Sequence, residues 1–340
     1  MIVTTRAPVR IDFAGGWTDV VDFASDEGGV VVSAALNLYA HAEIRTGGER
    51  ISLVAEDMLE RVSVARPSDL AYDGKLDLHK AAINMLPVAG GIEVLTRTDV
   101  PLGSGLGASG ALDVALVAGL VRCRDEECDV VELAEMGYEL ESRELGLLGG
   151  RQDQYAAAFG GLYEYTFDGE SVSRKKLELD NRAATDLLAH LTVIYSGRSH
   201  FSSATHEHVW NAYRARDATV SEALHGMRAA AVSAATAIEA ADWKSLARVV
   251  DENWSQQRRL HATVSTETTE IIERQCREAG AWAVKATGAG AGGCLLVMAP
   301  PENKERVTKA AAAAGGEVLS FEFDWDGVQV WEGSADVDGG

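Results

Sequence analysis

A glycine-rich segment at residues 101–113, PLGSGLGASGALD, carries the strongest chemical signal in the sequence. Backbone N–H groups of such a loop can close around phosphate groups, and the dipole of a following helix adds positive potential there. Ser109 falls at the expected helix start, where its hydroxyl can cap the helix or bind a metal ion. The segment lacks the Gly-Lys-Ser/Thr of a P-loop and the distant acidic residue of a dinucleotide-binding motif. A flexible turn is the alternative interpretation.

Two carboxylates, Glu141 and Asp153, are candidates for chemical roles because of their expected positions on helices. Glu141 lies on the apolar face of an amphipathic helix predicted over residues 129–145, and a carboxylate there is costly unless it is paired or bound to metal. Arg143 and Arg151 are its alternative partners. Asp153 falls in the first turn of a short helix, where the helix dipole favours the ionised carboxylate. An ionised carboxylate can accept a proton and act as a general base. An acidic residue at a helix start is also common for structural reasons alone.

Two further glycine-containing motifs, taken together with the first, resemble those of a known protein family. Residues 6–19 read RAPVRIDFAGGWTD and residues 285–294 read KATGAGAGGC. Together with 101–113, they resemble the three signature motifs of the GHMP kinase family, in the family order and at family-like spacing. AGGWTD, with GGRQDQYAAAFGG at 149–161 and YSGRSHFS at 195–202, resembles the sugar-1-kinase branch, which includes heptose 7-phosphate kinases and bacterial L-fucokinases. The chain length fits the heptose kinases better.

The resemblance implies a nucleotide site around the glycine-rich loop. In the family this loop wraps the ATP phosphates, and one serine of the loop holds Mg²⁺ together with a glutamate that matches Glu141. Ser109 keeps the metal-binding position, whereas Ala108 replaces a serine and removes one side-chain contact to phosphate. The implied ATP-binding residues are Pro101, Gly103, Ser104, Gly105, Leu106, Gly107, Ala108 and Ser109.

The resemblance also implies the groups around the transferring phosphate and the sugar. Asp153 matches the catalytic aspartate, and Arg10 matches a cation placed beside it. Asp19 matches a residue that binds sugar hydroxyls in galactokinase, but Gly16 and Trp17 replace the Glu and His of galactokinase, which argues against galactose. Trp17 is expected either to stack on a sugar or to pack internally. The other implied substrate-binding residues are Gly16, Thr18, Gly288, Ala289 and Gly290.

A substrate that already carries a phosphate needs a second anion site. Arg198, in the segment Tyr195–His200, is the best candidate, because this segment follows a buried strand and precedes a helix whose N-terminal amides can face an anion. Arg258 and Arg259 are secondary candidates. The alternative is a surface turn in which Arg198 is solvated.

The elements that must position these residues indicate an α+β fold. Strand-like and helical segments mix without strict alternation, and residues 204–240 show one long helical pattern. We expect an ATP-binding domain over 1–185, a second domain over 186–331 and a disordered tail over 332–340. The family resemblance implies that the first domain is like ribosomal protein S5 domain 2 and that the second is ferredoxin-like.

Composition narrows the class of protein. The 340 residues carry a net charge of −21, so nucleic acid and anionic membranes are poor partners. No segment reads as a membrane span or a signal peptide, and the four cysteines lack metal-binding spacing, which together predict a cytoplasmic protein with reduced thiols.

The sequence therefore predicts an ATP- and Mg²⁺-dependent kinase that phosphorylates the anomeric hydroxyl of a sugar, with D-glycero-D-manno-heptose 7-phosphate as the first choice of substrate. The alternatives are a kinase of a free sugar such as L-fucose, and a non-catalytic protein of the same fold that senses sugar and ATP. The presence of Asp153, Ser109 and Glu141 together favours the enzyme.

Overall fold

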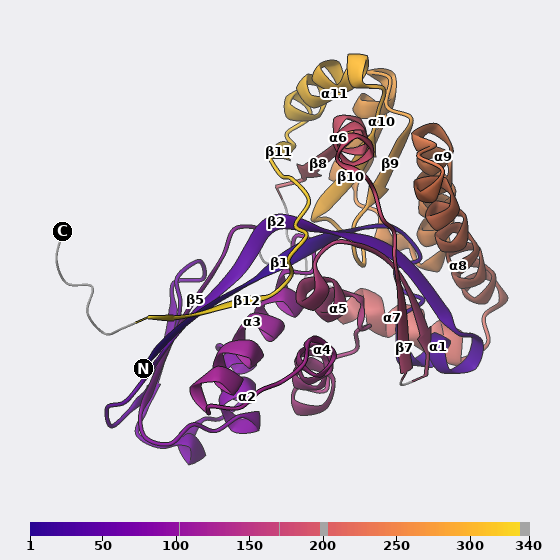
Figure 1. Ribbon diagram of the computed structural model, residues 1–340. Coiled ribbons are helices and arrows are strands. Elements are labelled where there is room, and N and C mark those ends of the chain that lie inside the picture. The colour runs from indigo at the N-terminus through magenta and orange to yellow at the C-terminus, as the bar shows by residue number, and fades with distance from the viewer. Residues whose placement is uncertain (102, 170, 198–202, 334–340) are drawn as a thin grey trace, which may run out of the picture.

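Two β-sheets organise the residues that the computed structural model describes, which are 1–101, 103–169, 171–197 and 203–333. The larger sheet crosses the middle of the molecule in Figure 1, with helices beneath it and the smaller sheet above. Both sheets are covered by helices without regular β-α alternation, so the α+β fold class is confirmed.

The larger sheet is built around two long strands, β1 and β2, which pair in antiparallel fashion. Register shifts in this pair fall at Pro8/Val9 and between Asp12 and Ala14, so β1 is irregular on both sides of Arg10. The strand order is β12-β1-β2-β5-β3-β4, and β6 pairs with the first half of β2 and with β7. The strands are β1 (Ile2–Ala14), β2 (Gly29–Thr46), β3 (Ile51–Ala55), β4 (Glu60–Val64), β5 (Ile92–Thr98), β6 (Leu162–Asp168), β7 (Ser171–Lys176) and β12 (Gln329–Gly333).

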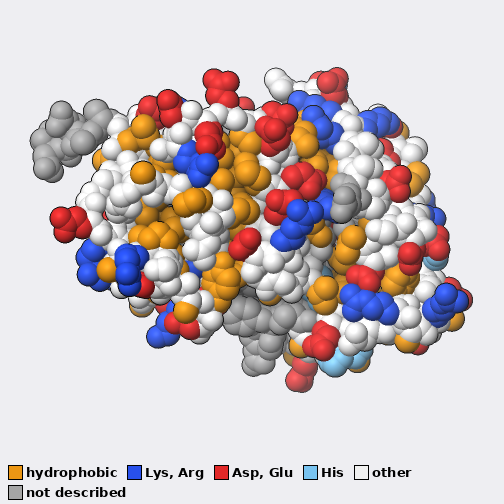
Figure 2. All heavy atoms as spheres, turned by 90° about the horizontal axis from the view of Figure 1, so that it is seen from below, with side chains coloured by type: hydrophobic (Ala, Val, Ile, Leu, Met, Phe, Trp, Pro, Cys, Tyr) orange, Lys and Arg blue, Asp and Glu red, His pale blue; other side chains and the backbone are white. Residues whose placement is uncertain are grey.

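Several helices pack beneath this sheet (Figure 1). They are α2 (Asp77–Met85), α3 (Ala108–Cys123), α4 (Val130–Glu139) and α5 (Gln152–Phe159), with a 3-10 turn η1 (Pro67–Asp69) before α2. Helix α3 contacts β1, β2, α4 and α5, and its residues 110–121 are all buried, as the apolar pattern predicted. Seen from below, hydrophobic side chains on this side of the molecule lie among scattered acidic ones (Figure 2).

The second half of the chain forms an antiparallel sheet with the order β11-β8-β10-β9. Helices α8 and α9 pack on each other, α8 also contacts β1 and β2, and α9 contacts β9 and β1, so this pair joins the two sheets. The remaining elements are α1 (Val21–Glu27), α6 (Asn181–His190), β8 (Leu191–Tyr195), α7 (Ser203–Arg214), α8 (Ala218–Glu239), α9 (Trp243–Leu260), η3 (Ala262–Val264), α10 (Glu267–Glu278), β9 (Ala283–Ala286), β10 (Cys294–Met298), α11 (Pro301–Ala313) and β11 (Glu317–Leu319).

The structure differs from the sequence-based expectation at several elements. The helical pattern over 204–240 is two helices, because Arg216 has a φ of 60° and Asp217 caps a new helix through the N–H of Val220. The final strand, β12, pairs with β1 of the first half instead of staying within the second domain, and it reaches Gly333, beyond the expected start of the tail. The rest of the tail lies outside the described residues.

The division of the chain near residue 185 stays a prediction, and that position falls inside α6. Within the described ranges, no helix has the length and apolar character needed to cross a membrane.

Candidate active site

The glycine-rich loop has the backbone shape of an anion-binding nest. Gly103, Gly105 and Gly107 have φ values of 72°, 76° and 73°, a left-handed conformation that side-chain-bearing residues rarely adopt. Helix α3 begins directly after Gly107, so its first N–H groups lack intrahelical partners and adjoin the loop. The side chains of Leu106 and Ala108 are buried, and the carbonyl of Leu106 accepts from the backbone N–H of Arg10. Residue 102 lies outside the described part of the chain.

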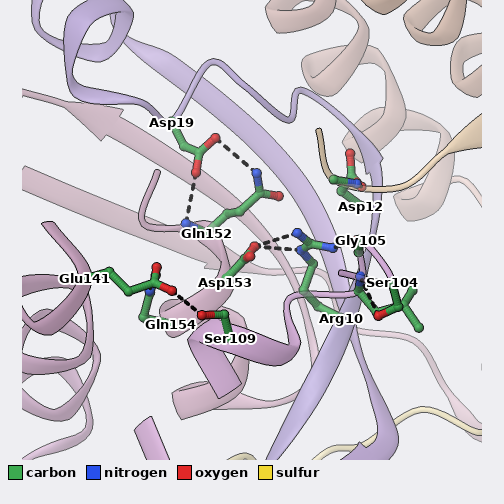
Figure 3. A network of polar contacts seen from close by, with 12 residues as sticks. Arg10, Asp12, Asp19, Ser104, Gly105, Ser109, Glu141, Gln152, Asp153 and Gln154 are labelled. Carbon is green, nitrogen blue, oxygen red and sulfur yellow. Dashed lines mark hydrogen bonds and ion pairs between the residues drawn. The ribbon is translucent and has the colours of Figure 1, made fainter. Parts of the chain in front are cut away.

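Arg10 and Asp153 form an ion pair beside this loop (Figure 3). Both Nε and Nη2 of Arg10 contact Oδ1 of Asp153, at 2.8 and 2.6 Å, and Nη1 donates to the carbonyl of Gly105 at 2.6 Å. No hydrogen bond to Oδ2 of Asp153 is found within the described residues, and a Cβ on Gly107 would stand 3.2 Å from that oxygen. The carboxylate therefore has one oxygen held by the guanidinium and one that faces the loop.

The burial of Arg10 makes this pair electrostatically strong. Its side chain is 3% exposed, against 29% for Asp153. Burial alone would lower the pKa of Arg10, but the charges of Asp153 and Asp12 outweigh it and raise the pKa above its ordinary value. The guanidinium thus stays charged, and the partly open Asp153 is the member of the pair that a substrate can reach.

A second polar network places Glu141 over the start of α3. The hydroxyl of Ser109 donates to Oε1 of Glu141, and Nε2 of Gln154 donates to Oε2 at 3.1 Å. Neither sequence-based alternative partner pairs with Glu141, because Arg143 pairs with Glu139 and Arg151 with Glu135. The expected helix over 129–145 changes at residue 140 into a π-helical turn, η2 (Leu140–Glu144), and this turn carries Glu141.

Glu141 and Ser109 offer the hard oxygen ligands that Mg²⁺ prefers. Burial raises the pKa of Glu141, whereas the hydrogen bond from Ser109 acts in the opposite direction. Behind Glu141, the fully buried Asp113 accepts from Gln154 with Oδ2. No group of three His, Cys, Asp or Glu side chains suitable for a metal occurs in the described ranges, so an ion here would depend on phosphate oxygens and water as well. Two oxygen ligands beside a phosphate loop fit that mode of binding.

Asp19 is tied to the helix that carries Asp153. Its Oδ2 accepts from the backbone N–H of Gln152 and its Oδ1 from the side-chain amide of Gln152, both at 3.0 Å. Gln152 is the first residue of α5, so Asp19 satisfies one of the free N–H groups at that helix start. Burial, as the largest cause, raises the pKa of Asp19 to about 6.

The neighbours of Asp19 in the first motif have mainly internal roles. The hydroxyl of Thr18 contacts the carbonyls of Gly15 and Val30, and the residue is fully buried. Trp17, with a φ of 78°, stacks on His206 with ring centroids 4.4 Å apart and is 3% exposed. This position favours internal packing over stacking on a sugar. The substrate-binding roles of both residues stay predictions.

The third glycine segment approaches the other two. The carbonyl of Gly288 accepts from Nε2 of Gln257 at 2.9 Å, and a Cβ on Gly288 would stand 2.9 Å from the carbonyl of Gly105. Ala291 has a left-handed φ of 62°, and its backbone N–H donates to the carbonyl of Val264. Ala289 and Gly290 complete the loop.

The two candidates for a distal anion site that lie within the described residues, Arg258 and Arg259, are not supported by the structure. Arg198 lies outside the described residues. Arg258 pairs with Glu273 and Arg259 with Glu222, so both secondary candidates are already neutralised by carboxylates.

Several residues at the site were not singled out from the sequence. They are Asp12, Asp113, Gln152, Gln154, Asn253 and Gln257, each at most 7% exposed. Their common signal is a polar residue at a buried position of a strand or helix, which is costly unless it is hydrogen-bonded. For Asn253 and Gln257, the spacing of four residues on one amphipathic helix was visible in the sequence.

The raised pKa of Asp19 predicts a pH-dependent effect on stability. Between about pH 4 and pH 6 the unfolded chain ionises this carboxyl before the folded chain does, so rising pH works against the folded state. Asp19→Asn removes this effect, and its stability relative to wild type should improve by up to about 3 kcal/mol as pH rises from 4 to above 6, and then stay level. Urea unfolding of both proteins at pH 4.5, 6 and 7.5 measures it. Parallel curves of stability against pH would contradict the assignment.

Comparison with known proteins places this geometry in a family. The model of the GHMP kinases N terminal domain matches residues 76–161, and that of the GHMP kinases C terminal matches residues 234–317, together half of the chain. The D-glycero-alpha-D-manno-heptose 7-phosphate kinase of Campylobacter jejuni is 29% identical over 97% of this chain and 98% of its own length.

Two further proteins are similar to this chain over nearly its whole length. The crystal structure of a D-glycero-D-manno-heptose 1-phosphate kinase from Bacteroides thetaiotaomicron is 27% identical, covers 98% of this chain and 100% of that chain, and has a TM-score of 0.81. The bifunctional fucokinase/GDP-fucose pyrophosphorylase of Arabidopsis thaliana is 24% identical over 94% of this chain, which corresponds to 32% of that protein. With a family model in each half and similarity along nearly its whole length, the chain belongs to the GHMP kinase family.

Proposed function

We propose that this protein is an ATP-dependent sugar kinase that transfers the γ-phosphate to the anomeric hydroxyl of D-glycero-D-manno-heptose 7-phosphate. The observation that carries the proposal is the arrangement of Asp153, whose Oδ1 is held by Arg10 while Oδ2 faces the glycine-rich loop. A carboxylate oxygen that accepts no hydrogen bond from any described residue, next to a glycine-rich loop, is suited to accept a proton from an attacking hydroxyl.

The chain's own residues supply most of the expected chemistry. The N–H groups of the loop and of the first turn of α3 hold the phosphates, and Asp153 Oδ2 orients the sugar hydroxyl and takes its proton. Arg10 keeps Asp153 ionised and adds positive charge beside the phosphate that moves. Mg²⁺, held by Glu141 and Ser109, would neutralise charge on the phosphate oxygens.

The choice of sugar is supported by the relatives. The Campylobacter protein, similar over nearly the whole chain, is a kinase of a heptose 7-phosphate. Such a substrate needs a cation for its distal phosphate, and Arg198 stays the candidate for that role.

A free sugar such as L-fucose is the second candidate, and one observation favours it. Three cations of the described ranges are already paired with carboxylates: Lys285 with Asp12, Arg214 with Asp22 and Arg258 with Glu273. A fucokinase is also among the relatives. A sensor of the same fold would bind sugar and ATP without turnover.

A substrate panel separates these functions. The purified protein is incubated with ATP, Mg²⁺ and each of heptose 7-phosphate, the free heptose, L-fucose and galactose, and ADP release is followed. We expect the highest kcat/KM with the heptose 7-phosphate and a new phosphate signal on the anomeric carbon by ³¹P NMR. A preference for L-fucose would replace the substrate assignment, and ADP release with none of the sugars would contradict the kinase.

Asp153→Asn tests the general base. The amide keeps the shape of the side chain but cannot accept the proton, so kcat should fall by roughly 10²–10⁴-fold. The fold and the affinity for ATP should change little, as measured by thermal unfolding and by nucleotide titration. Near-normal turnover of the folded variant would show that Asp153 is not the base.

Glu141→Gln and Ser109→Ala test the metal site. Each removes a hard oxygen ligand or its charge, so each should raise the Mg²⁺ concentration that gives half-maximal rate. Glu139→Gln, two residues earlier at the end of α4 and paired with Arg143, is the matched control and should leave that concentration unchanged. An unchanged Mg²⁺ dependence in both test variants would place the metal elsewhere.

A further inference from the structure

Asp12 and Lys285 form an ion pair in the interior, between the first and the third glycine-containing motifs. Oδ2 of Asp12 and Nζ of Lys285 are 2.5 Å apart, and the two side chains are 1% and 0% exposed. Asp12 belongs to β1 and Lys285 to β9, so the pair joins the larger sheet to the smaller one. Neither residue has a part in the phosphoryl transfer described above.

Every polar group of the pair is used. The ammonium of Lys285 also contacts the backbone carbonyls of Asp12 and Ala286, at 3.2 and 3.1 Å, so its three hydrogens have three acceptors. The second oxygen of Asp12, Oδ1, accepts from the backbone N–H of Gly288 at 3.2 Å. Asp12 thereby holds both the strand and the loop of the third motif.

From Gly288, contacts lead to the catalytic pair. Gly288 packs closely on Gly105. A Cβ on Gly105 would stand 2.6 Å from the carbonyl oxygen of Thr287, and a Cβ on Gly288 would stand 2.9 Å from the carbonyl oxygen of Gly105. The carbonyl of Gly105 in turn accepts from Nη1 of Arg10, which holds Asp153. The position of the third loop therefore sets the position of the carbonyl that orients Arg10.

Charge connects the same groups directly. Arg10 and Asp12 are two residues apart on β1, and both are buried there. Asp12 thus lies near two cations, Arg10 and Lys285. Arg10 is paired with Asp153, and Asp12 neutralises Lys285. Without that carboxylate, an unpaired ammonium would remain in the interior beside the catalytic pair.

The sugar-binding motif is shaped around Asp12 as well. A Cβ on Gly16 would stand 2.8 Å from Oδ2 of Asp12, although the φ of Gly16 is not in the left-handed region. Glycine is required at position 16 by the space that the carboxylate occupies. The carboxylate of Asp12 therefore fills the place of a side chain in the loop that precedes Asp19.

We propose that Asp12 and Lys285 are positioning residues for phosphoryl transfer, a buried ion pair that fixes the third glycine segment against the phosphate loop and so sets the geometry of Arg10 and Asp153. The proposal rests on the proposed kinase function. Stability alone is a weak reason for such a pair, because desolvation of two buried charges offsets most of their attraction.

Three variants test the pair: Asp12→Asn, Lys285→Met and the double variant. Each folded single variant should lose about 10–100-fold in kcat, the scale of a misplacement of roughly 1 Å, while the KM for ATP changes little. The double variant, which leaves no unpaired charge, should be no slower than the slower single variant. Rates are measured at least 15 degrees below each Tm, so that only folded protein is compared.

Lys80→Met is the matched control. Lys80 is 2% exposed and pairs with Asp73 and Asp77 at the start of α2, and neither partner belongs to the three glycine segments. Its loss should lower Tm without changing kcat. Hydrogen exchange at residues 286–293 gives a second readout, because loss of the pair should speed exchange in this loop even without substrate.

The outcomes distinguish a failure of the positioning role from a failure of the proposed kinase function. An active wild type whose three variants keep kcat within twofold, whatever their Tm, overturns the positioning role and leaves the kinase intact. Losses in the double variant equal to the product of the single losses also overturn it, because the residues then act separately. A wild type that phosphorylates no sugar fails at the proposed function, and unchanged exchange at 286–293 would then overturn the structural link independently.

Discussion

The ion pair between Arg10 and Asp153 is the interaction on which the rest of the site depends. It joins a strand from the start of the chain to a helix more than a hundred residues later, at the edge of the glycine-rich loop. A buried guanidinium needs a carboxylate, and this carboxylate needs one free oxygen to serve as a base. Gly110 makes the contact possible, because a Cβ there would stand 2.6 Å from Cβ of Asp153 and push α5 away from α3. The sequence around the loop is thus set by the approach of Asp153 as well as by phosphate.

The two halves of the molecule meet at the same place. Helix α9 presents two buried amides one turn apart: Asn253 accepts from the N–H of Gly15, and Gln257 donates to the carbonyl of Gly288. One helix therefore holds the first and the third motif at once, and the pair Asp12–Lys285 is a second connection between them. Hydrogen bonds to backbone fix loops whose glycines would otherwise move freely. This arrangement explains why polar residues that touch no substrate are buried around a kinase site.

Much of this could be predicted from the sequence, and the misses have physical reasons. The glycine-rich loop, the all-round apolar helix α3 and the family resemblance are local patterns, and they led to the fold class and to the residues that meet at the site. The π-helical turn that carries Glu141 breaks the 3.6-residue period on which the helix prediction relied. The pairing of β12 with β1 and of Asp12 with Lys285 depends on segments that are hundreds of residues apart, which no local pattern reveals. Arg258 and Arg259 looked available because their partners, Glu273 and Glu222, come from other helices.

The central claim is that Asp153 Oδ2 receives the proton of the sugar hydroxyl while Arg10 holds Oδ1. A crystal structure with the sugar acceptor and a non-hydrolysable ATP analogue tests this most directly, through the distance from Oδ2 to the nearest anomeric oxygen. The account predicts about 2.6–3.2 Å, with Arg10 still on Oδ1 and the terminal phosphate on the far side of that oxygen. An anomeric oxygen held by another residue, beyond hydrogen-bond reach of Asp153, would contradict it.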